Sequence, residues 1–307
     1  MHASQKPIVI VGSVTMDLVT RTPQIPRVGQ TLIGSGFHTT PGGKGANQAV
    51  AAARLGYPTA MVAKVGDDNY GAALLKNLGE AGVRTDAMEQ VAGSSGIAAI
   101  FLADSSENSI VVVPGANGKM DRATVDAHAA TIRAAGLVLC QLEIPMETLE
   151  HTLAVCAEAG VPVMLDPAPA AALPDAAWKQ IAWFTPNESE AEFYLGDGAK
   201  TEDAASELLD RGLGGVVLKR GAEGAYVAVP GKAAWVPAFK VEAIDTVAAG
   251  DCFNGAFAVA LLEGRDPWEA ARFANAAAAI CVTRRGAQAA MPSRAEVDAL
   301  IGARDAQ

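Results

Sequence analysis

The sequence predicts an α/β fold of three layers, in which a mostly parallel central sheet lies between helices and a small second sheet acts as a lid. Short apolar runs alternate along the chain with Ala-rich segments of helical spacing, a pattern typical of parallel strands buried on both faces. Two stretches, at about 14–40 and 96–113, break this alternation and indicate strands. Because no linker or internal repeat divides the 307 residues, we expect one domain over 1–307 with these two stretches inserted as the lid.

The individual elements follow from the same patterns. Residues 14–40 are rich in Thr, Gly and Pro and lack a helical pattern, whereas 96–113 holds two apolar runs around a polar turn, which predicts a hairpin. A further helix, rich in Ala, Phe and Leu, is expected after Asp251. The expected buried strands are 8–11, 59–63, 137–139, 161–165 and 215–218, and the expected helices between them are roughly 45–55, 70–81, 121–134, 147–159 and 202–211.

The composition argues against several classes of protein. Thirty-four acidic residues against 24 basic ones give a net charge of −10, whereas a surface that binds nucleic acid is basic. The four cysteines form no C-x-x-C pair, which favours reduced, buried thiols over a disulfide framework or a zinc site. No stretch approaches the roughly 18 apolar residues of a membrane span, and the apolar run near the N-terminus is too short for a signal peptide. We therefore expect a soluble, cytoplasmic protein that binds neither nucleic acid nor membranes.

The motif DTVAAGD, residues 245–251, precedes the expected Ala-rich helix. A Gly-Asp pair that opens a helix leaves free backbone N–H groups that converge on one point, which makes an anion site. Asp251 can then accept the proton of a hydroxyl that attacks a phosphoryl group, with 248–251 as the anion hole. The alternative is that Asp251 is only the cap of the helix, which is the commoner role of Asp at such a position.

A second group of residues suits a polyhydroxylated ligand. PGGKGANQ, residues 41–48, offers bare backbone and the amide of Asn47, although Gly-rich helix entries are often only structural and the Walker P-loop pattern is absent. Asp17 follows the first expected strand and Glu143 follows another. Carboxylates there can accept two hydroxyl hydrogen bonds at once, as the vicinal diol of a sugar requires. For Asp17, a turn-forming role is an equal alternative.

Two further segments point to a nucleotide. In TPNESE, Asn187 and Glu190 lie three residues apart on one helical face and can hold a hydrated Mg²⁺ near phosphates. The same pair is more often a capping box, and that alternative stays open. LKRGAEG, residues 218–224, is a Gly-spaced connection between strands that can line a nucleotide.

Taken in order along the chain, these motifs resemble those of the ribokinase-like carbohydrate kinases, also called the PfkB family. The combination of GGKGANQA with DTVAAGDCFNGA is highly specific for that family. The resemblance covers nearly the whole chain through GSVTMD, GGKGANQA, GVRTD, PGAN, QLEIP, DPAPA, TPNESEAE, DTVAAGDCFNGA and RFANAAAAICVTRRGAQ.

The resemblance implies ATP-dependent phosphorylation of D-ribose at its 5-hydroxyl, giving ribose 5-phosphate and ADP. It also implies a lid that closes over the sugar and serves as the interface of a homodimer. Asp251 matches the catalytic base, and Gly250, Ala249 and Ala248 match the anion hole. The positions that match sugar contacts are Thr15, Met16, Asp17, Gly43, Lys44, Gly45, Ala46, Asn47, Glu143 and Asp251.

The same resemblance implies sites for ATP, Mg²⁺ and K⁺. Glu190 completes the N-x-x-E pattern associated with Mg²⁺, which it would hold through water. The positions that match nucleotide contacts are Asn187, Lys219, Arg220, Gly221, Ala222, Glu223, Gly224, Gly250, Asp251 and Asn275. Those that match an activating K⁺ site, mostly through backbone carbonyls, are Asp245, Val247, Cys281, Arg284, Gly286 and Ala290.

Three residues depart from the family pattern. Thr15 stands where Asn is frequent and has a shorter, single donor, which leaves deoxyribose, a ketohexose, a sugar acid or a nucleoside open as the acceptor. Ala290 stands where Ser is frequent, so the K⁺ site is expected to be weaker or completed by water. Lys219 stands where Thr often faces the phosphates, and it adds positive charge beside ATP.

Two functions of other classes fit the sequence less well than a sugar kinase does. A non-catalytic sugar-binding protein on the same fold would need neither the Gly250–Asp251 pair nor Asn187 and Glu190. A nicotinamide-dependent dehydrogenase would carry G-x-G-x-x-G after its first strand, where this chain has IVIVGSVTMD. Both are therefore disfavoured.

Overall fold

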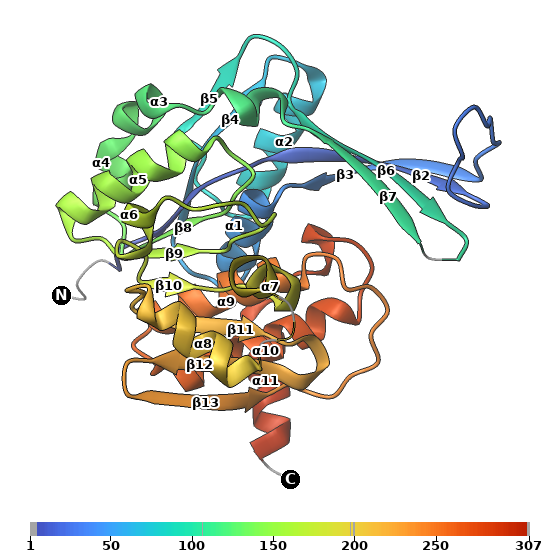
Figure 1. Cartoon of the computed structure of the whole chain (residues 1–307). Coiled ribbons are helices and arrows are strands. Elements are labelled where there is room, and N and C mark those ends of the chain that lie inside the picture. Colours follow the sequence, from blue (N-terminus) through green and yellow to red (C-terminus); the bar gives the residue numbers. More distant parts are fainter. Residues whose placement is uncertain (1–4, 106, 197, 199, 306–307) are drawn as a thin grey trace.

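A nine-stranded sheet forms the middle of the protein (Figure 1) in a computed structural model that describes residues 5–105, 107–196, 198 and 200–305. Its strand order is β13-β12-β11-β10-β9-β8-β1-β4-β5. Every neighbouring pair from β11 to β5 is parallel, and β12 and β13 add an antiparallel edge. The strands are β1 (Ile8–Val11), β4 (Thr59–Gly66), β5 (Met88–Val91), β8 (Leu137–Cys140), β9 (Val163–Leu165), β10 (Trp183–Phe184), β11 (Val216–Lys219), β12 (Gly224–Val229) and β13 (Lys232–Pro237).

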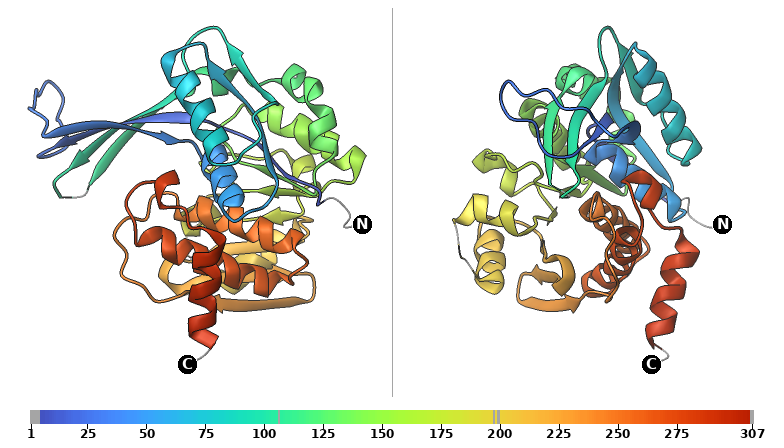
Figure 2. Two further views of the ribbon diagram at one scale, coloured as in Figure 1. Left: turned by 180° about the vertical axis from the view of Figure 1, so that it is seen from behind. Right: turned by 90° about the vertical axis from the view of Figure 1, so that its right-hand side faces the viewer.

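Helices cover both faces of this sheet (Figure 2), so the predicted three-layer α/β fold is confirmed. Successive residues of a strand point to opposite faces: Ile8 and Ile10 join one core cluster, and Val9 and Val11 join the other. One face packs against α1 (Lys44–Arg54), α2 (Asn69–Glu80), α9 (Ala249–Leu262), α10 (Pro267–Val282) and α11 (Arg294–Asp305). The other packs against α3 (Arg122–Ala127), α4 (Ala129–Arg133), α5 (Met146–Ala159), α6 (Asp175–Trp178), α7 (Glu188–Leu195) and α8 (Thr201–Asp210).

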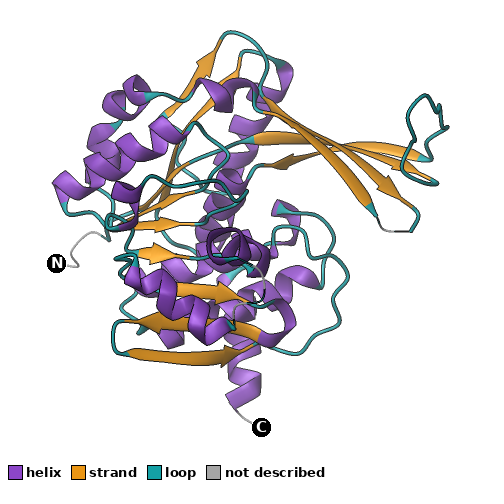
Figure 3. Ribbon diagram, viewed as in Figure 1, coloured by secondary structure: helices purple, strands orange, loops and turns teal. Residues whose placement is uncertain are grey.

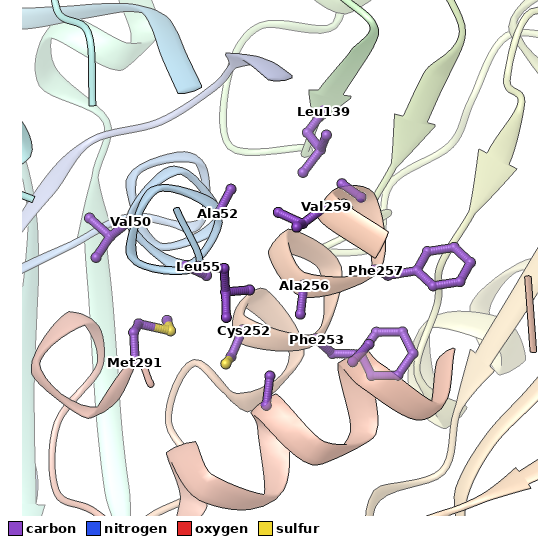
Figure 4. Packing of buried hydrophobic residues seen from close by; sticks show 14 of the residues in the cluster. Val50, Ala52, Leu55, Leu139, Cys252, Phe253, Ala256, Phe257, Val259 and Met291 are labelled. Carbon is purple, nitrogen blue, oxygen red and sulfur yellow. The ribbon is translucent and has the colours of Figure 1, made fainter. Parts of the chain in front are cut away.

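Small residues bring α1 and α9 into close contact. A Cβ on Gly255 of α9 would lie 2.7 Å from the Cβ of Ala51 and 2.8 Å from the carbonyl oxygen of Gln48, so only glycine fits at this crossing. Figure 4 shows Ala52 and Leu55 on the side of the α1 segment that faces α9. The contact fixes the first turn of α1 beside the first turn of α9.

A separate four-stranded sheet projects from the body as an arm, which consists of strands and loops (Figure 3). Its strands, in spatial order, are β3 (Gly36–Gly42), β2 (Thr15–Thr22), β6 (Gly96–Ala103) and β7 (Asn108–Val113). The strands expected within 14–40 and 96–113 are confirmed, including the hairpin of β6 and β7.

Two details of the sequence prediction were wrong. Asp17 lies within β2 and pairs with Thr40 and Ala98, so it is neither in a turn nor directly after the first strand. The helix expected over 121–134 is interrupted at His128, which separates α3 from α4. The short 3₁₀ segments η1 (Gly115–Lys119), η2 (Gly221–Glu223) and η3 (Gln288–Ala290) complete the chain. Among the described residues, no helix combines the length and apolar composition of a membrane span.

Candidate active site

Polar side chains collect where five neighbouring parallel strands end. Ser13 follows β1, Gln141 follows β8, Asp166 follows β9, Asn187 follows β10, and Lys219 is the last residue of β11. In open α/β sheets, ligands bind beyond the carboxyl ends of the strands. The candidate site therefore lies along this edge of the sheet.

A cavity of about 510 Å³ opens at the same edge. Its walls come from α1, from the loops after β9 and β10, from the end of β11 and from the start of α9. The structure thus brings several residues of the predicted sugar, nucleotide and anion sites together, among them Lys44, Asn187, Glu190, Lys219, Gly250 and Asp251.

Asp251 is buried, with 6% of its surface exposed, and it is not a helix cap. The cap position of α9 is Ala248, which makes no side-chain cap hydrogen bond. The carboxylate of Asp251 instead accepts a hydrogen bond of 2.9 Å from Asn47 Nδ2 and one of 3.2 Å from Gln48 Nε2. The capping alternative is therefore wrong, and the side chain faces the cavity.

The backbone at the start of α9 is shaped to leave donors free. Ala248 has a φ of 59°, a left-handed conformation that is unfavourable for a residue with a Cβ and is typical of strained functional turns. The N–H of Ala249 is used within this turn, on the carbonyl of Thr246. Within the described part of the chain, the N–H groups of Gly250 and Asp251 have no acceptor, as an anion hole requires.

The electrostatics around Asp251 favour a proton acceptor. Burial raises the pKa of Asp251 to about 6; Lys44 opposes this shift and Asp166 adds to it. The sequence alone suggests an ordinary carboxyl pKa near 4. Burial lowers the pKa of Lys44, but the charges of Asp251, Asp166 and other carboxylates outweigh it, so this pKa lies above its ordinary value. A carboxylate with a pKa near 6 accepts a proton more readily than an ordinary one.

Amide side chains orient the group around Asp251. Gln141 Nε2 donates to Gln48 Oε1 at 2.7 Å, which turns Gln48 Nε2 towards both Asp251 and Asp166 Oδ2, the latter at 2.9 Å. Gln288 Nε2 donates to Asn47 Oδ1 at 3.2 Å and so directs Asn47 Nδ2 to Asp251. The residues predicted from the sequence do not include Gln48, Gln141, Asp166 or Gln288, although each lies in a motif that carries the family resemblance.

Asp17 and Thr15 form one side of the predicted sugar site. Thr15 Oγ1 donates to Asp17 Oδ1 at 3.0 Å. Burial raises the pKa of Asp17 to about 6, the Thr15 hydrogen bond lowers it, and the charge of Glu143 raises it. A Cβ on Gly42 would lie 2.4 Å from Asp17 Oδ2, so glycine leaves the space that this carboxylate occupies.

Glu143 and the Gly-rich start of α1 form the other side. Glu143 Oε2 accepts hydrogen bonds from Ser13 Oγ at 2.5 Å and from the N–H of Lys44 at 3.0 Å. Gly43 has a φ of 90°, and a Cβ there would lie 2.8 Å from the backbone nitrogen of Thr15. Gly45 is equally constrained, since its Cβ would lie 2.7 Å from the backbone nitrogen of Ser13.

Two residues of the predicted sugar site have side chains that point elsewhere. Met16 and Ala46 belong to the hydrophobic core cluster, and neither side chain is available to a polar ligand. The N–H of Ala46 also has a partner, the carbonyl of Ser13 at 2.9 Å. Their contribution is to hold β2 and α1 in position.

Asn187 and Glu190 form the capping box of α7, which is the alternative role predicted from the sequence for this pair. Asn187 Oδ1 accepts from the N–H of Glu190 at 2.9 Å, and Glu190 Oε2 accepts from the N–H of Asn187 at 2.8 Å. Burial raises the pKa of Glu190, and the charge of Lys219 opposes this. Glu190 and Asp166 both line the cavity. A carboxylate in such a cavity suits Mg²⁺, which keeps several waters and needs few protein ligands.

The predicted nucleotide residues after β11 form a tight connection to β12. Arg220 Nη1 lies 2.5 Å from Glu188 Oε1, and Gly221 lines the cavity, whereas Ala222 and Glu223 are exposed. Gly224 has a φ of 109° and lies where β12 begins. Asn275 is buried in α10, where its amide donates to the carbonyls of Val236 and Pro237 at 2.9 and 3.2 Å. A nucleotide contact by Asn275 stays a prediction.

The residues predicted for K⁺ lie in or next to two loops that Asp245 joins. Asp245 Oδ1 accepts from the N–H of Val247 at 3.0 Å, and Oδ2 accepts from the N–H of Gly286 at 2.9 Å. The N–H groups of Ile244 and Asp245 also donate to the carbonyl of Val282. Of the remaining predicted ligands, Cys281 lies in the last turn of α10, Arg284 follows this helix, and Ala290 ends η3. A role in cation binding stays a prediction.

The model of the pfkB family carbohydrate kinases matches residues 5–294 of the chain. The chain belongs to this family. It is 45% identical to a ribokinase of Bacillus subtilis over 295 residues, which cover 96% of this chain and 99% of that one. It is 38% identical to a deoxyribokinase of Salmonella typhi over 292 residues, which cover 93% and 95% of the two chains.

Solved structures of family members have the same fold. The ribokinase of Arabidopsis thaliana, solved with ribose and ATP, superposes with a TM-score of 0.91 at 34% identity and covers 96% of this chain and 98% of its own. Membership of the pfkB family and the predicted ribokinase-like fold, with a large mostly parallel sheet and a smaller one, are thereby confirmed.

Proposed function

We propose that this pfkB-family kinase transfers the γ-phosphoryl group of ATP to the 5-hydroxyl of D-ribose, giving ribose 5-phosphate and ADP. The observation that carries the proposal is the position of Asp251: a buried carboxylate, held by Asn47 and Gln48, beside two free N–H groups at the start of α9. The Bacillus subtilis and Arabidopsis thaliana relatives are ribokinases, which supports D-ribose as the acceptor.

The chemistry assigned to each group follows from its type and surroundings. The 5-oxygen of the sugar attacks the γ-phosphorus, the bond to the β–γ bridging oxygen breaks, and its electron pair leaves with ADP. Asp251 takes the proton of the attacking hydroxyl as the new P–O bond forms. The N–H groups of Gly250 and Asp251 stabilise the charge on the transferred group. Asp17, Glu143, Asn47 and the backbone of Gly43 hold the remaining hydroxyls of the sugar.

Two ions complete the proposal. Glu190 would hold Mg²⁺ through water beside the phosphates, where the ion would supply charge neutralisation. The loops joined by Asp245 would hold an activating K⁺ through their carbonyls. The hydrogen bonds of Asp245 to Val247 and Gly286 support this, because they fix the two loops relative to each other.

The four-stranded sheet is proposed as the lid of a single kinase domain over 1–307 and as the interface of a homodimer. It carries Asp17 on β2, so its movement brings this carboxylate over the sugar and excludes water. Its strands leave apolar side chains exposed, among them Phe37, Ile110 and Val111. A second copy of the chain would cover these side chains and the unpaired edges of β3 and β7.

A different acceptor within the same chemistry is the second candidate. The similarity to a deoxyribokinase and the single hydroxyl of Thr15 favour a test of deoxyribose first, before ketohexoses, sugar acids and nucleosides. The experiment is coupled ADP release across these acceptors with Mg²⁺ and K⁺. We expect the highest kcat/KM with D-ribose; a higher value with another sugar would move the substrate and keep the mechanism. If none of the acceptors gives ADP release, the chain is a sugar-binding protein without kinase activity.

A further inference from the structure

The proposed anion hole at the start of α9 is bordered by Lys219, to which the proposed transfer step assigns no part. Lys219 ends β11, and its backbone is fixed on the nucleotide side: its N–H donates to the carbonyl of Pro186 at 2.9 Å, and it forms a β-bridge with Asn187. Its side chain is 13% exposed and lines the same cavity as Gly250 and Asp251. The ammonium group is therefore inside the site and not on its rim.

Two distances place this ammonium group. Lys219 Nζ lies 2.9 Å from Asp166 Oδ1, in a pair whose carboxylate is 3% exposed. A Cβ built on Gly250 would lie 3.4 Å from Lys219 Nζ, so the ammonium is next to the first free N–H group of the anion hole. Asp166 is in turn joined to Asp251 through Gln48 Nε2, which donates to both carboxylates. Base, amide, carboxylate and ammonium form one continuous chain.

We propose that Lys219 is a further catalytic residue, whose ammonium group contacts the phosphoryl group in transfer, and that Asp166 is the residue that positions it. An ammonium has three N–H donors, and Asp166 takes one of them, which leaves two for phosphoryl oxygens. Catalysis of phosphoryl transfer depends chiefly on stabilising the negative charge on these oxygens. Lys219 keeps its proton throughout, since the proton of the sugar hydroxyl goes to Asp251. The proposal rests on the proposed sugar kinase activity.

The ion pair explains why the lysine is useful in this position. An unpaired lysine in a buried site would be costly and free to adopt several rotamers. Asp166 holds Nζ beside Gly250 before ATP arrives, and Gln48 and Gln141 fix the carboxylate in turn. Such preorganised charge contributes more to catalysis than a mobile surface lysine does.

The test compares Lys219→Met with wild type in turnover and binding. We expect kcat to fall about 100-fold and KM for D-ribose to change by less than about threefold, because the contact is made in the transition state. By titration calorimetry, ADP should bind to Lys219→Met within about threefold of wild type. ADP with ribose and aluminium fluoride, a mimic of the transferred group, should bind at least about 30-fold more weakly.

Matched variants separate catalysis from folding. Lys64→Met removes another buried lysine, which lies 3.5 Å from both Glu89 and Asp121 and lines no part of this cavity; it should keep wild-type kcat. Asp166→Asn should lower kcat less than Lys219→Met does, and the double variant should be no slower than Lys219→Met alone. The role of Lys219 is overturned if Lys219→Met keeps more than about a third of the wild-type kcat. It is also overturned if the variant weakens the binding of ADP as much as it weakens the binding of the mimic. If wild type phosphorylates no sugar, the proposed function itself fails.

Discussion

Asn47 Nδ2 donates a hydrogen bond of 2.9 Å to Oδ2 of Asp251, across a separation of 204 residues in the chain. The bond joins the first turn of α1 to the first turn of α9, which the glycine contact at Gly255 holds together. Asp251 lines the cavity, and among the described residues its carboxylate is bonded to Asn47 and Gln48 and not to the free N–H groups of its own helix. Asp251 is in this way available as a base, and the N–H groups remain available to an anion.

The first prediction concerns the pH dependence of turnover. Asp251 and Asp17 both have a pKa of about 6, and both act as carboxylates. As the pH falls through 6 both become protonated, so log(kcat/KM) for the sugar should fall with a slope that approaches about 2. In Asp17→Asn the slope should be about 1, because one titrating group remains. A kcat/KM that stays level from about pH 7 to pH 5 would contradict the roles assigned to both carboxylates.

The second prediction concerns stability. Because the folded-state pKa of Asp17 is about 6 against an ordinary 3.8, the folded protein binds more protons than the unfolded chain between these values. The ionised carboxylate of Asp17 therefore lowers the free energy of unfolding above about pH 6. Below its ordinary pKa the carboxyl is protonated in both states and this penalty is absent. Asp17→Asn should raise the free energy of unfolding by about 1–2 kcal/mol at about pH 7.5, and less at about pH 4.5. Urea unfolding at both pH values measures this; an equal change at both would contradict it.

The third prediction tests the proposed K⁺ site. Asp245→Ala removes the carboxylate that accepts from the N–H groups of Val247 and Gly286, so the two loops lose their fixed spacing. The ratio of kcat in potassium to kcat in sodium should exceed 1 in wild type and fall to about 1 in the variant. Asp67→Ala is the control, since Asp67 also accepts from a backbone N–H, that of Gly93, but in a loop after β4. If Asp245→Ala keeps the wild-type ratio of kcat in potassium to kcat in sodium, Asp245 is not part of the K⁺ site.

The fourth prediction concerns the proposed homodimer. Every residue of β7 is exposed, including Ile110 at 50% and Val111 at 58%, which point to opposite faces of the sheet. Sedimentation velocity at about 10 µM should show a dimer for wild type, and Ile110→Asp or Val111→Asp should shift it to monomer. Phe193→Asp, at an exposed apolar position of α7, should remain a dimer. A wild-type monomer at this concentration would refute the interface.

The sequence predicts the strands and helices with strong periodicity and fails where the pattern is short or non-local. β10 has two residues and β5 is MEQV, half of it polar, so neither stands out as a buried strand. The interruption at His128 leaves the apolar spacing of 121–134 nearly unchanged and is therefore invisible in it.

The site residues divide in the same way, into those that a local motif reveals and those that depend on contacts between distant segments. Asp251 and Asn187 stand out because their motifs combine residue types that suit chemistry or capping. Whether Asp251 caps α9 depends on the backbone of Ala248, which the sequence does not reveal. The role of Gln48 depends on Gln141, 93 residues away, which decides which end of the amide faces Asp251. Contacts of this kind exist only once the sheet has brought the ends of β1, β8 and β9 together.

The most direct measurement for the whole account is turnover and sugar binding in Asp251→Asn. If Asp251 is the base, kcat with D-ribose should fall by about 10³-fold, while the dissociation constant of the sugar stays within about threefold. Asp266→Asn provides the comparison, because Asp266 does cap the next helix, α10, through the N–H groups of Trp268 and Glu269. It should keep kcat within about threefold. An Asp251→Asn protein that retains more than about a tenth of wild-type turnover would contradict the central claim.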